Sequence, residues 1–276
     1  TQTAGTFSAG STTLTFTSPF TLSGGIFNST TGTFTVGGTW THTAGGTFNH
    51  NNGTVVFTGN YLTLDVMTTE TFNHLTFNGS GGSPYFDIAT GDTLLALGTL
   101  SLTVGQVNIG TLEARGNVTV ASTYGGGSAT LLFSGSAVQT FDLTGATDKF
   151  MGPITVNKSG GKVALGSALV MPTYNRSFTV SGGTLDLNGY NFSQSYDTSQ
   201  FFTVNSGGNL QLQGGETISI PSAIVLNSGS TVTYDGTAPS YTLKNYAYKN
   251  LTMNGGAESL FSLPASITGM TAVTIT

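Results

Sequence analysis

Polar and apolar residues alternate one by one through much of this chain. The alternation is clear in Thr13–Thr17 (Thr-Leu-Thr-Phe-Thr), in Gly32–Val36, in Thr39–Thr41 and in Leu210–Gln213. A period of two places one side of a strand against a core and the other side against water. Gly-Gly, Asn-Gly and Ser-Gly pairs lie between these segments and supply tight turns. No segment sustains a helical period, so the pattern predicts an all-β protein.

The strand pattern also repeats. Gly24–Asn28 (Gly-Gly-Ile-Phe-Asn) recurs 21 residues later as Gly45–Asn49, and a period near twenty is typical of one turn of a β-solenoid. A longer repeat joins three octamers that read aromatic, two spacers, apolar, Thr, apolar, Asn: Phe72–Gly79, Phe150–Asn157 and Tyr248–Gly255. We therefore expect one continuous solenoid over residues 1–276, with sub-repeats at about 1–74, 75–153, 154–250 and 251–276, the last incomplete.

Two architectures fit these repeats. In a parallel β-helix of about a dozen coils, strands stack about 4.8 Å apart and inward side chains form apolar columns. In the alternative, a string of small antiparallel β-sandwich modules, each longer repeat is its own domain. The short period favours the parallel β-helix. The expected core side chains are Phe7, Phe27, Phe48, Phe57, Phe77, Leu112 and Leu185.

The octamers support a resemblance to a class of surface proteins. Phe72–Gly79, which follows Val56–Gly59 (Val-Phe-Thr-Gly), and Tyr248–Gly255 resemble the tandem β-strand repeats of very large bacterial and archaeal cell-surface proteins. Those repeats resemble in turn the β-helical shafts of filamentous haemagglutinin and autotransporter-type adhesins. The resemblance implies surface display, adhesion, or fibre and sheath formation, and it offers no catalytic motif.

The composition excludes several classes of protein. Only 7% of the residues are charged, and the seven Lys and Arg are too dispersed to neutralise a nucleic-acid backbone. No run of apolar residues is long enough for a membrane-spanning helix. Disorder is excluded by 18 Phe and 10 Tyr, and the absence of Cys excludes disulfides and thiolate metal sites. A surface rich in Thr, Ser, Asn and Gly indicates an extracellular or cell-surface location.

Some polar residues are candidates for chemistry. His42 and His50 flank Gly46 and could bind a metal ion, but no carboxylate is close in sequence, so we interpret both as solvated turn residues. A polysaccharide-active enzyme would need carboxylates aligned on neighbouring coils, often with a basic residue. The acidic pairs are Asp65/Glu70, Asp87/Asp92 and Asp142/Asp148, the last beside Lys149. Turn compositions explain these pairs better than catalysis or Ca²⁺ binding.

Hydroxyl and aromatic side chains suggest surfaces. Thr13/Thr15/Thr17, Thr33/Thr35 and Thr39/Thr41/Thr43 place hydroxyls on one side of a strand, as in β-solenoid ice-binding proteins, although Thr is also a common polar residue of strands. Exposed Tyr residues could stack on sugars, whereas the alternation predicts that Trp40 is buried.

Together these features predict a structural protein that is not an enzyme. We expect a subunit or segment of an extracellular fibre, sheath or cell-surface adhesin shaft that assembles with copies of itself through β-strand stacking. The alternatives are a carbohydrate- or surface-binding adhesin domain and, less favoured, a β-helical polysaccharide-active enzyme or an ice-binding protein. The expected partners are copies of the chain and surface glycans, without nucleic acid. The sequence indicates no catalytic, cofactor-binding or metal-binding residue and no cofactor.

Overall fold

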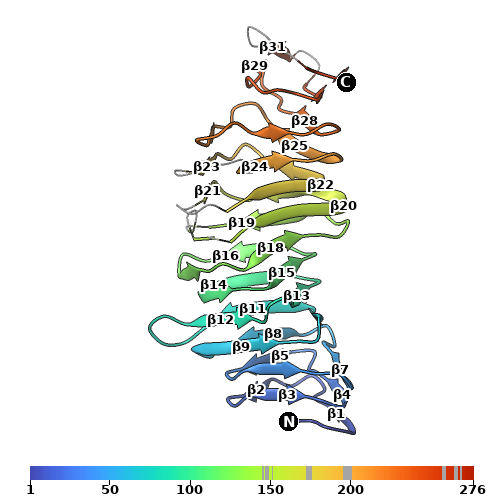
Figure 1. The fold of residues 1–276 in the computed structure, drawn as a ribbon, viewed down its shortest axis with the longest axis vertical. Helices are drawn as coiled ribbons and strands as arrows, with labels where there is room; N and C mark the ends of the chain where they lie inside the picture. Colours follow the sequence, from blue (N-terminus) through green and yellow to red (C-terminus); the bar gives the residue numbers. More distant parts are fainter. Residues whose placement is uncertain are drawn as a thin grey trace. The chain divides into compact units, whose positions relative to one another are not determined.

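The chain is a tandem-repeat parallel β-solenoid of about 11 turns (Figure 1). The structure, a computed structural model, describes residues 1–144, 146, 149–150, 152–171, 176–194, 201–256, 259–263, 267 and 269–276. These residues form 32 strands. None of them lies in a helix, so the described part of the chain holds no helix long and apolar enough to cross a membrane. The predicted parallel β-helix of about a dozen coils is confirmed, and the antiparallel sandwich alternative is wrong.

Two units make up the solenoid, and each has its own core. Unit 1 consists of Thr1–Leu132 and Leu143–Gly152, and unit 2 consists of Phe133–Asp142 and Pro153–Thr276. Each is described separately below. The predicted division into four sub-repeats stays a prediction.

A turn of unit 1 has three sides, which we name the hydroxyl face, the tyrosine face and the third face. The hydroxyl face contains β2 (Leu14–Phe16), β5 (Thr33–Val36), β8 (Thr54–Phe57), β11 (His74–Asn78), the start of β14 (Leu100–Asn108) and β16 (Val118–Val120). The tyrosine face contains β3 (Phe20–Leu22), β6 (Trp40–His42), β9 (Tyr61–Asp65), β12 (Tyr85–Ile88), the end of β14 and β17 (Tyr124–Gly126). The third face contains β1 (Thr6–Ser8), β4 (Gly25–Asn28) and β7 (Gly46–Asn49), and further along the chain β10 (Thr69–Phe72), β13 (Thr93–Ala96) and β15 (Thr111–Ala114). The last strand to begin in unit 1 is β18 (Thr130–Phe133).

Parallel pairing in register turns the sequence alternation into columns. On the hydroxyl face, the inward column is Phe16, Val36, Phe57, Phe77, Leu102 and Val120. The outward column beside it is Thr15, Thr35, Val56, Thr76, Ser101 and Thr119. Because side chains alternate sides along a strand, a slip of one residue would exchange the two columns and expose the apolar one.

The interior of the early turns is aromatic. Trp40 is fully buried, as predicted, and its ring centroid lies 4.3 Å from that of Phe20 and 5.0 Å from that of Phe48. It also packs edge-on against Phe57 and Phe72, at 5.8 and 5.6 Å. Aromatic pairs at these distances stabilise beyond their buried area.

The predicted core residues are mostly buried. Five are at most 3% exposed: Phe27, Phe57, Phe77, Leu112 and Leu185. The prediction is wrong for Phe7, which is 38% exposed, and for Phe48, which is half-buried. Both lie on the outer strands of the three-stranded sheet β1–β4–β7, where a further strand covers only one side. Phe7 stacks on Phe27 with centroids 4.8 Å apart, so the column is continued but not enclosed.

Unit 2 repeats this three-sided turn with other side chains. Its polar face contains β19 (Gln139–Asp142), the end of β20 (Ile154–Leu165), the end of β22 (Phe178–Asp186), β25 (Gly208–Leu212), β28 (Thr231–Tyr234), β30 (Asn250–Met253) and β32 (Ala272–Ile275). A second side contains the starts of β20 and β22, β24 (Phe202–Val204) and β27 (Val225–Leu226). The remaining strands are β21 (Leu169–Met171), β23 (Phe192–Gln194) and β26 (Ile218–Ser219), and the pair β29 (Ser240–Thr242) and β31 (Leu260–Ser262).

The inward column behind the polar face of unit 2 is aliphatic. It contains Val163, Leu185, Leu210, Val232 and Leu251, and it ends with Val273, which is 46% exposed. On another side of the core, the buried rings of Phe178, Phe192 and Phe202 pack together. Strand β22 passes from one side of the turn to the next at Gly182 and Gly183 without a break. Gly183 has a φ of +71°, and a Cβ there would lie 2.7 Å from the Cβ of Lys158. Only glycine fits this corner.

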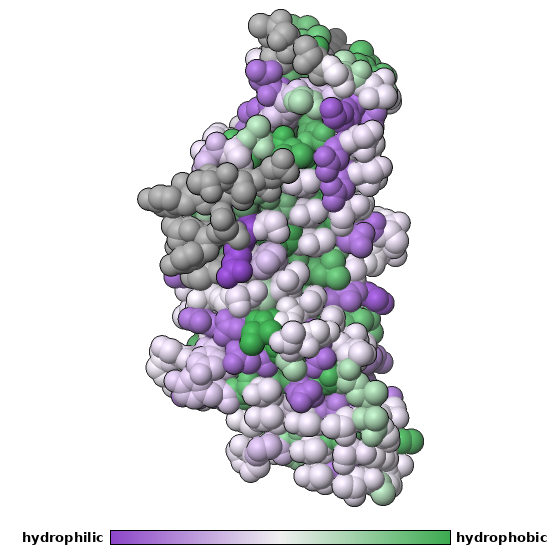
Figure 2. Space-filling view, in the orientation of Figure 1, coloured by the Kyte–Doolittle hydropathy of each residue, from purple (hydrophilic) through white to green (hydrophobic). Residues whose placement is uncertain are grey.

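The outer surface is weakly polar. Figure 2 shows one side of the molecule, on which mid-scale hydropathy colours dominate and strongly hydrophilic residues are scattered. This agrees with a chain in which 7% of residues are charged and 40 are glycine.

Candidate functional site

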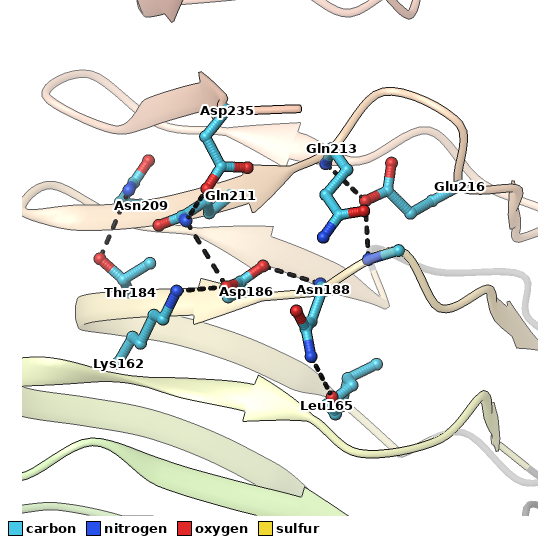
Figure 3. Close-up of polar contacts among 11 residues, drawn as sticks. Lys162, Leu165, Thr184, Asp186, Asn188, Asn209, Gln211, Gln213, Glu216 and Asp235 are labelled. Carbon is cyan, nitrogen blue, oxygen red and sulfur yellow. Dashed lines mark hydrogen bonds and ion pairs between the residues drawn. The ribbon is translucent and has the colours of Figure 1, made fainter. Parts of the chain in front are cut away.

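A group of interacting polar side chains lies on the polar face of unit 2 (Figure 3). We name this group the polar network, and its members are Lys162, Thr184, Asp186, Asn209, Gln211, Glu216 and Asp235. Register pairing places Lys162 beside Thr184, and Asp186 beside Gln211, on adjacent turns. The strands thus hold outward side chains of successive turns close enough to bond.

Asp186 is the centre of the polar network. Its Oδ2 lies 2.6 Å from the Nζ of Lys162 on the preceding turn, and its Oδ1 accepts a bond of 2.7 Å from the backbone N–H of Asn188. Gln211 Nε2, on the following turn, lies 3.5 Å from Oδ2. Asp186 is only 2% exposed, and such a buried carboxylate is tolerated because these partners compensate its charge.

Gln211 also donates from Nε2 to Oδ2 of Asp235, one turn further on. Asp235 is half-buried, and its Oδ1 has no partner among the described residues. Burial raises the pKa of Asp235, and the charge of Asp186 adds to the rise, whereas the bond from Gln211 opposes it. Asp186 is therefore paired with a cation, whereas the pKa of Asp235 is raised above its ordinary value.

Glu216 lies at the edge of the polar network, in the connection that follows β25. Its carboxylate accepts backbone N–H bonds from Gln213 and from Gly214, the latter at 2.7 Å. It also accepts a bond of 3.2 Å from Gly189, on the preceding turn. Glu216 is fully buried, and its carboxylate satisfies three backbone donors that come from two turns.

Two carboxylates with different protonation preferences are the usual starting point for acid–base chemistry. Here the geometry favours a structural role. Asp186 is enclosed, and all of its contacts run to residues of its own or adjacent turns. A substrate would have to break these bonds to reach it. The hydrogen bonds and the ion pair of the polar network join consecutive turns.

The histidine prediction requires a correction. His42 is not a solvated turn residue: it ends strand β6, and its Nδ1 lies 2.6 Å from Oε2 of Glu70. Both side chains are largely buried, at 13% and 6% exposed. The hydrogen bond to Glu70 raises the pKa of His42, against the opposing effect of burial. His50 does lie in a turn, where its Nδ1 accepts a bond from the backbone of Asn52.

The other predicted carboxylates do not converge. Asp92 accepts a buried backbone bond from Val66, and Asp87 accepts a bond from Asn108. Asp142 is the last residue of β19 rather than a turn residue, and Asp148 lies outside the described residues. Within the described part of the chain, no three His, Cys, Asp or Glu residues are grouped so as to hold a metal ion.

A hollow of about 450 Å³ lies beside the first turn of unit 1, lined by Thr1–Phe7, Phe16, Phe20, Thr21 and Phe27. Its lining side chains include no Asp, Glu, His, Lys or Arg. It therefore offers no side chain for acid–base chemistry.

The predicted threonine groups are only partly one surface. Thr15 and Thr35 are register partners on the hydroxyl face, where the outward column continues beyond Thr76 with Ser101 and Thr119. Thr41 lies on the tyrosine face instead, between Thr21 and Asp65.

The polar network was not identified from the sequence. Its signal is a polar residue after an apolar one at register-paired positions of two turns, Leu185-Asp186 and Leu210-Gln211. Asp235 follows Tyr234, the register partner of Leu212, so it lies two positions further along its turn than Gln211 does. Alignment of the turns would have revealed it. Glu216 gives no such signal, because it lies in a connection between strands.

Searches against protein-family models, curated proteins and solved structures gave no match. The fold itself places the chain in the class of parallel β-solenoids with tandem repeats.

Proposed function

We propose that this chain is a structural segment or subunit of an extracellular fibre, sheath or cell-surface adhesin shaft. The observation that carries the proposal is the stacking of inward apolar residues on consecutive turns within each unit. In unit 2, for example, Leu185, Leu210, Val232 and Leu251 follow one another on consecutive turns. An architecture in which each turn contacts its neighbours bears load along the stack and builds surfaces rather than enclosed pockets.

The sparse charge supports the same role. The faces are rich in hydroxyl groups and carry few Lys or Glu residues. Copies of the chain can therefore pack side by side with little charge repulsion and little cost of removing water from charged side chains. The polar network adds bonds between turns without using cysteine. We propose that copies of this chain associate with one another in the assembled material.

Electron microscopy and force measurements test the proposal. At rising concentration the purified chain should form regular assemblies. When pulled from both ends it should unfold in steps of one or a few turns. Dispersed particles at every concentration, together with unfolding in one step at low force, would contradict the structural role. A screen against polysaccharides tests the enzyme alternative, because hydrolysis that is lost in Asp186→Asn would overturn the proposal.

A further inference from the structure

The tyrosine face of unit 1 carries an arrangement that the structural role does not explain. Three adjacent strands, β9, β12 and the end of β14, present two outward columns: Tyr61, Tyr85 and Gln106 in one, and Thr63, Asp87 and Asn108 in the other. We name these six residues the tyrosine patch. The residues between the columns, Leu62, Phe86 and Val107, are buried beneath it.

Two large aromatic side chains are exposed beside each other on adjacent strands of this face. Tyr61 is 60% exposed and Tyr85 is 37% exposed, and their rings meet edge to face with centroids 4.4 Å apart. The outward column of the hydroxyl face, in contrast, carries Thr and Ser with one Val. Exposed aromatic rings lose contact with water favourably when a ligand covers them, and tyrosine loses little side-chain entropy on binding.

The second column supplies hydrogen-bonding groups beside the rings. Asn108 Nδ2 donates to Oδ1 of Asp87 at 3.2 Å, and Asn108 Oδ1 accepts a bond from the backbone of Ser128, which together orient both side chains. Successive outward residues of a strand lie about 6.5–7 Å apart, and adjacent strands lie about 4.8 Å apart. A six-membered sugar ring that covers a tyrosine can therefore direct its hydroxyls towards Thr63, Asp87 and Gln106.

The start of strand β9 borders the patch with a further polar group. Asn60 precedes Tyr61, and its Oδ1 is enclosed without a hydrogen-bond partner among the described residues. Gly81, in the loop between β11 and β12, lies against the Asn60 side chain, where a Cβ would be 3.0 Å away. This loop, which also carries Ser80 and Ser83, forms a polar edge at one end of the patch.

The charged residues near the patch indicate which kind of polymer it can bind. Unit 1 contains only two of the seven Lys and Arg residues, Arg115 and Lys149, and neither belongs to the patch. The charged groups at the patch are the carboxylates of Asp87 and the neighbouring Asp65, which is exposed. Such a surface repels anionic polymers and leaves neutral, hydroxyl-rich ones unaffected.

We propose that the tyrosine patch binds a neutral polysaccharide. Sugar rings stack on Tyr61 and Tyr85, and their hydroxyls bond to Thr63, Asp87, Gln106 and Asn108. The site is open and flat, so it takes a chain along its length rather than a single small sugar. The proposal adds a ligand to the structural role and does not depend on self-assembly.

Affinity electrophoresis of the full chain through gels containing cellulose derivatives, xylan, mannan or glucan tests the proposal. Alginate and polygalacturonate serve as anionic comparisons. We expect retardation by at least one neutral polymer and none by the anionic ones. Tyr61→Ala and Tyr85→Ala should each weaken binding about tenfold, which corresponds to about 1.4 kcal/mol. Tyr61→Phe and Tyr85→Phe should bind nearly as well as the natural chain.

Tyr190→Ala provides the matched control, because Tyr190 is 39% exposed but lies in unit 2, outside the patch. It should bind like the natural chain, and circular dichroism should show that all variants are folded. Three results would overturn the proposal: no retardation by any neutral polymer, retardation by anionic polymers only, or undiminished retardation of both alanine variants. A tyrosine-dependent self-association seen by sedimentation, without polysaccharide binding, would assign the patch to a second copy and would equally overturn it.

Discussion

Units 1 and 2 stack their strands in the same parallel way but differ in the most prominent side-chain interactions between successive turns. In the early turns of unit 1, aromatic rings interlock, with Trp40 among Phe20, Phe48, Phe57 and Phe72. In unit 2, an aliphatic column lies behind the polar face, the rings of Phe178, Phe192 and Phe202 pack on another side of the core, and the bonds of the polar network run between turns on the outer side. The buried inward columns specify the strand register in both units. Aromatic packing around Trp40 adds to this in unit 1, and the hydrogen bonds of the polar network add to it in unit 2.

The largest effect should follow the removal of the central ring of unit 1. Trp40→Ala should lower the stability of unit 1 by about 3–5 kcal/mol, because a fully buried aromatic leaves a cavity between its neighbours. Hydrogen exchange resolved by residue measures this as lost protection in the surrounding turns. Trp40→Phe should cost less. Equal loss of protection throughout unit 2 would show that the two units do not differ as described.

The corresponding test in unit 2 is Glu216→Ala. It leaves the backbone donors of Gln213, Gly214 and Gly189 without their acceptor and should cost about 2–3 kcal/mol. Glu216→Gln keeps one acceptor oxygen, so urea unfolding should show a smaller loss of unfolding free energy than for Glu216→Ala. The matched control in unit 1 is Glu113→Gln, which disturbs a pair with the exposed Arg115 and should cost less than about 0.5 kcal/mol. Comparable losses of unfolding free energy in Glu216→Ala and Glu113→Gln would show that Glu216 has no special role.

The two units should also respond differently to pH. The pKa of His42 is raised in the folded state by Glu70, so the pair stabilises unit 1 fully below the ordinary value of 6.5. That contribution is lost as the pH rises through the raised pKa. Thermal unfolding of unit 1 should therefore shift to lower temperature as the pH rises above 6.5 and through the raised pKa of His42. His42→Gln should flatten the profile, and an unchanged profile in that variant would exclude the pair as its cause.

The smallest effect is expected at Asp235. A carboxyl group with a raised pKa favours the folded state at low pH and disfavours it once ionised. Asp235→Asn keeps an acceptor for Gln211 and removes the charge, so at pH 7 its stability should lie within about 0.5 kcal/mol of the natural chain or above it. Asp186→Asn, which breaks the pair with Lys162, should cost about 1–3 kcal/mol. Calorimetry of both variants measures the two losses of stability. A larger loss in Asp235→Asn than in Asp186→Asn would contradict the assigned roles.

The fold could be predicted because two simple signals agree. Alternation defines the strands, and a period near twenty defines the turns. Burial of individual residues could not be predicted as well, because it depends on which strand covers them. Phe48 and Phe57 have similar sequence surroundings, yet only Phe57 is enclosed.

The interactions between turns were harder to predict because turn length varies. Register partners are 24 residues apart at Trp40 and Leu64, 22 apart at Lys162 and Thr184, and 25 apart at Asp186 and Gln211. The first turns repeat after 20 and 21 residues. A single fixed period therefore misaligns these partners. The pairing of His42 with Glu70 and the polar network become visible only when the register of each turn is known.

Parallel stacking in short turns also has a kinetic consequence. Leu185 meets its partner Leu210 as soon as one further turn of chain is available, and Val232 and Leu251 follow in the same way. Loop closure is inexpensive over such short separations. A chain that emerges gradually, from a ribosome or a narrow conduit, can therefore complete one layer at a time, with the finished layers serving as a template for the next.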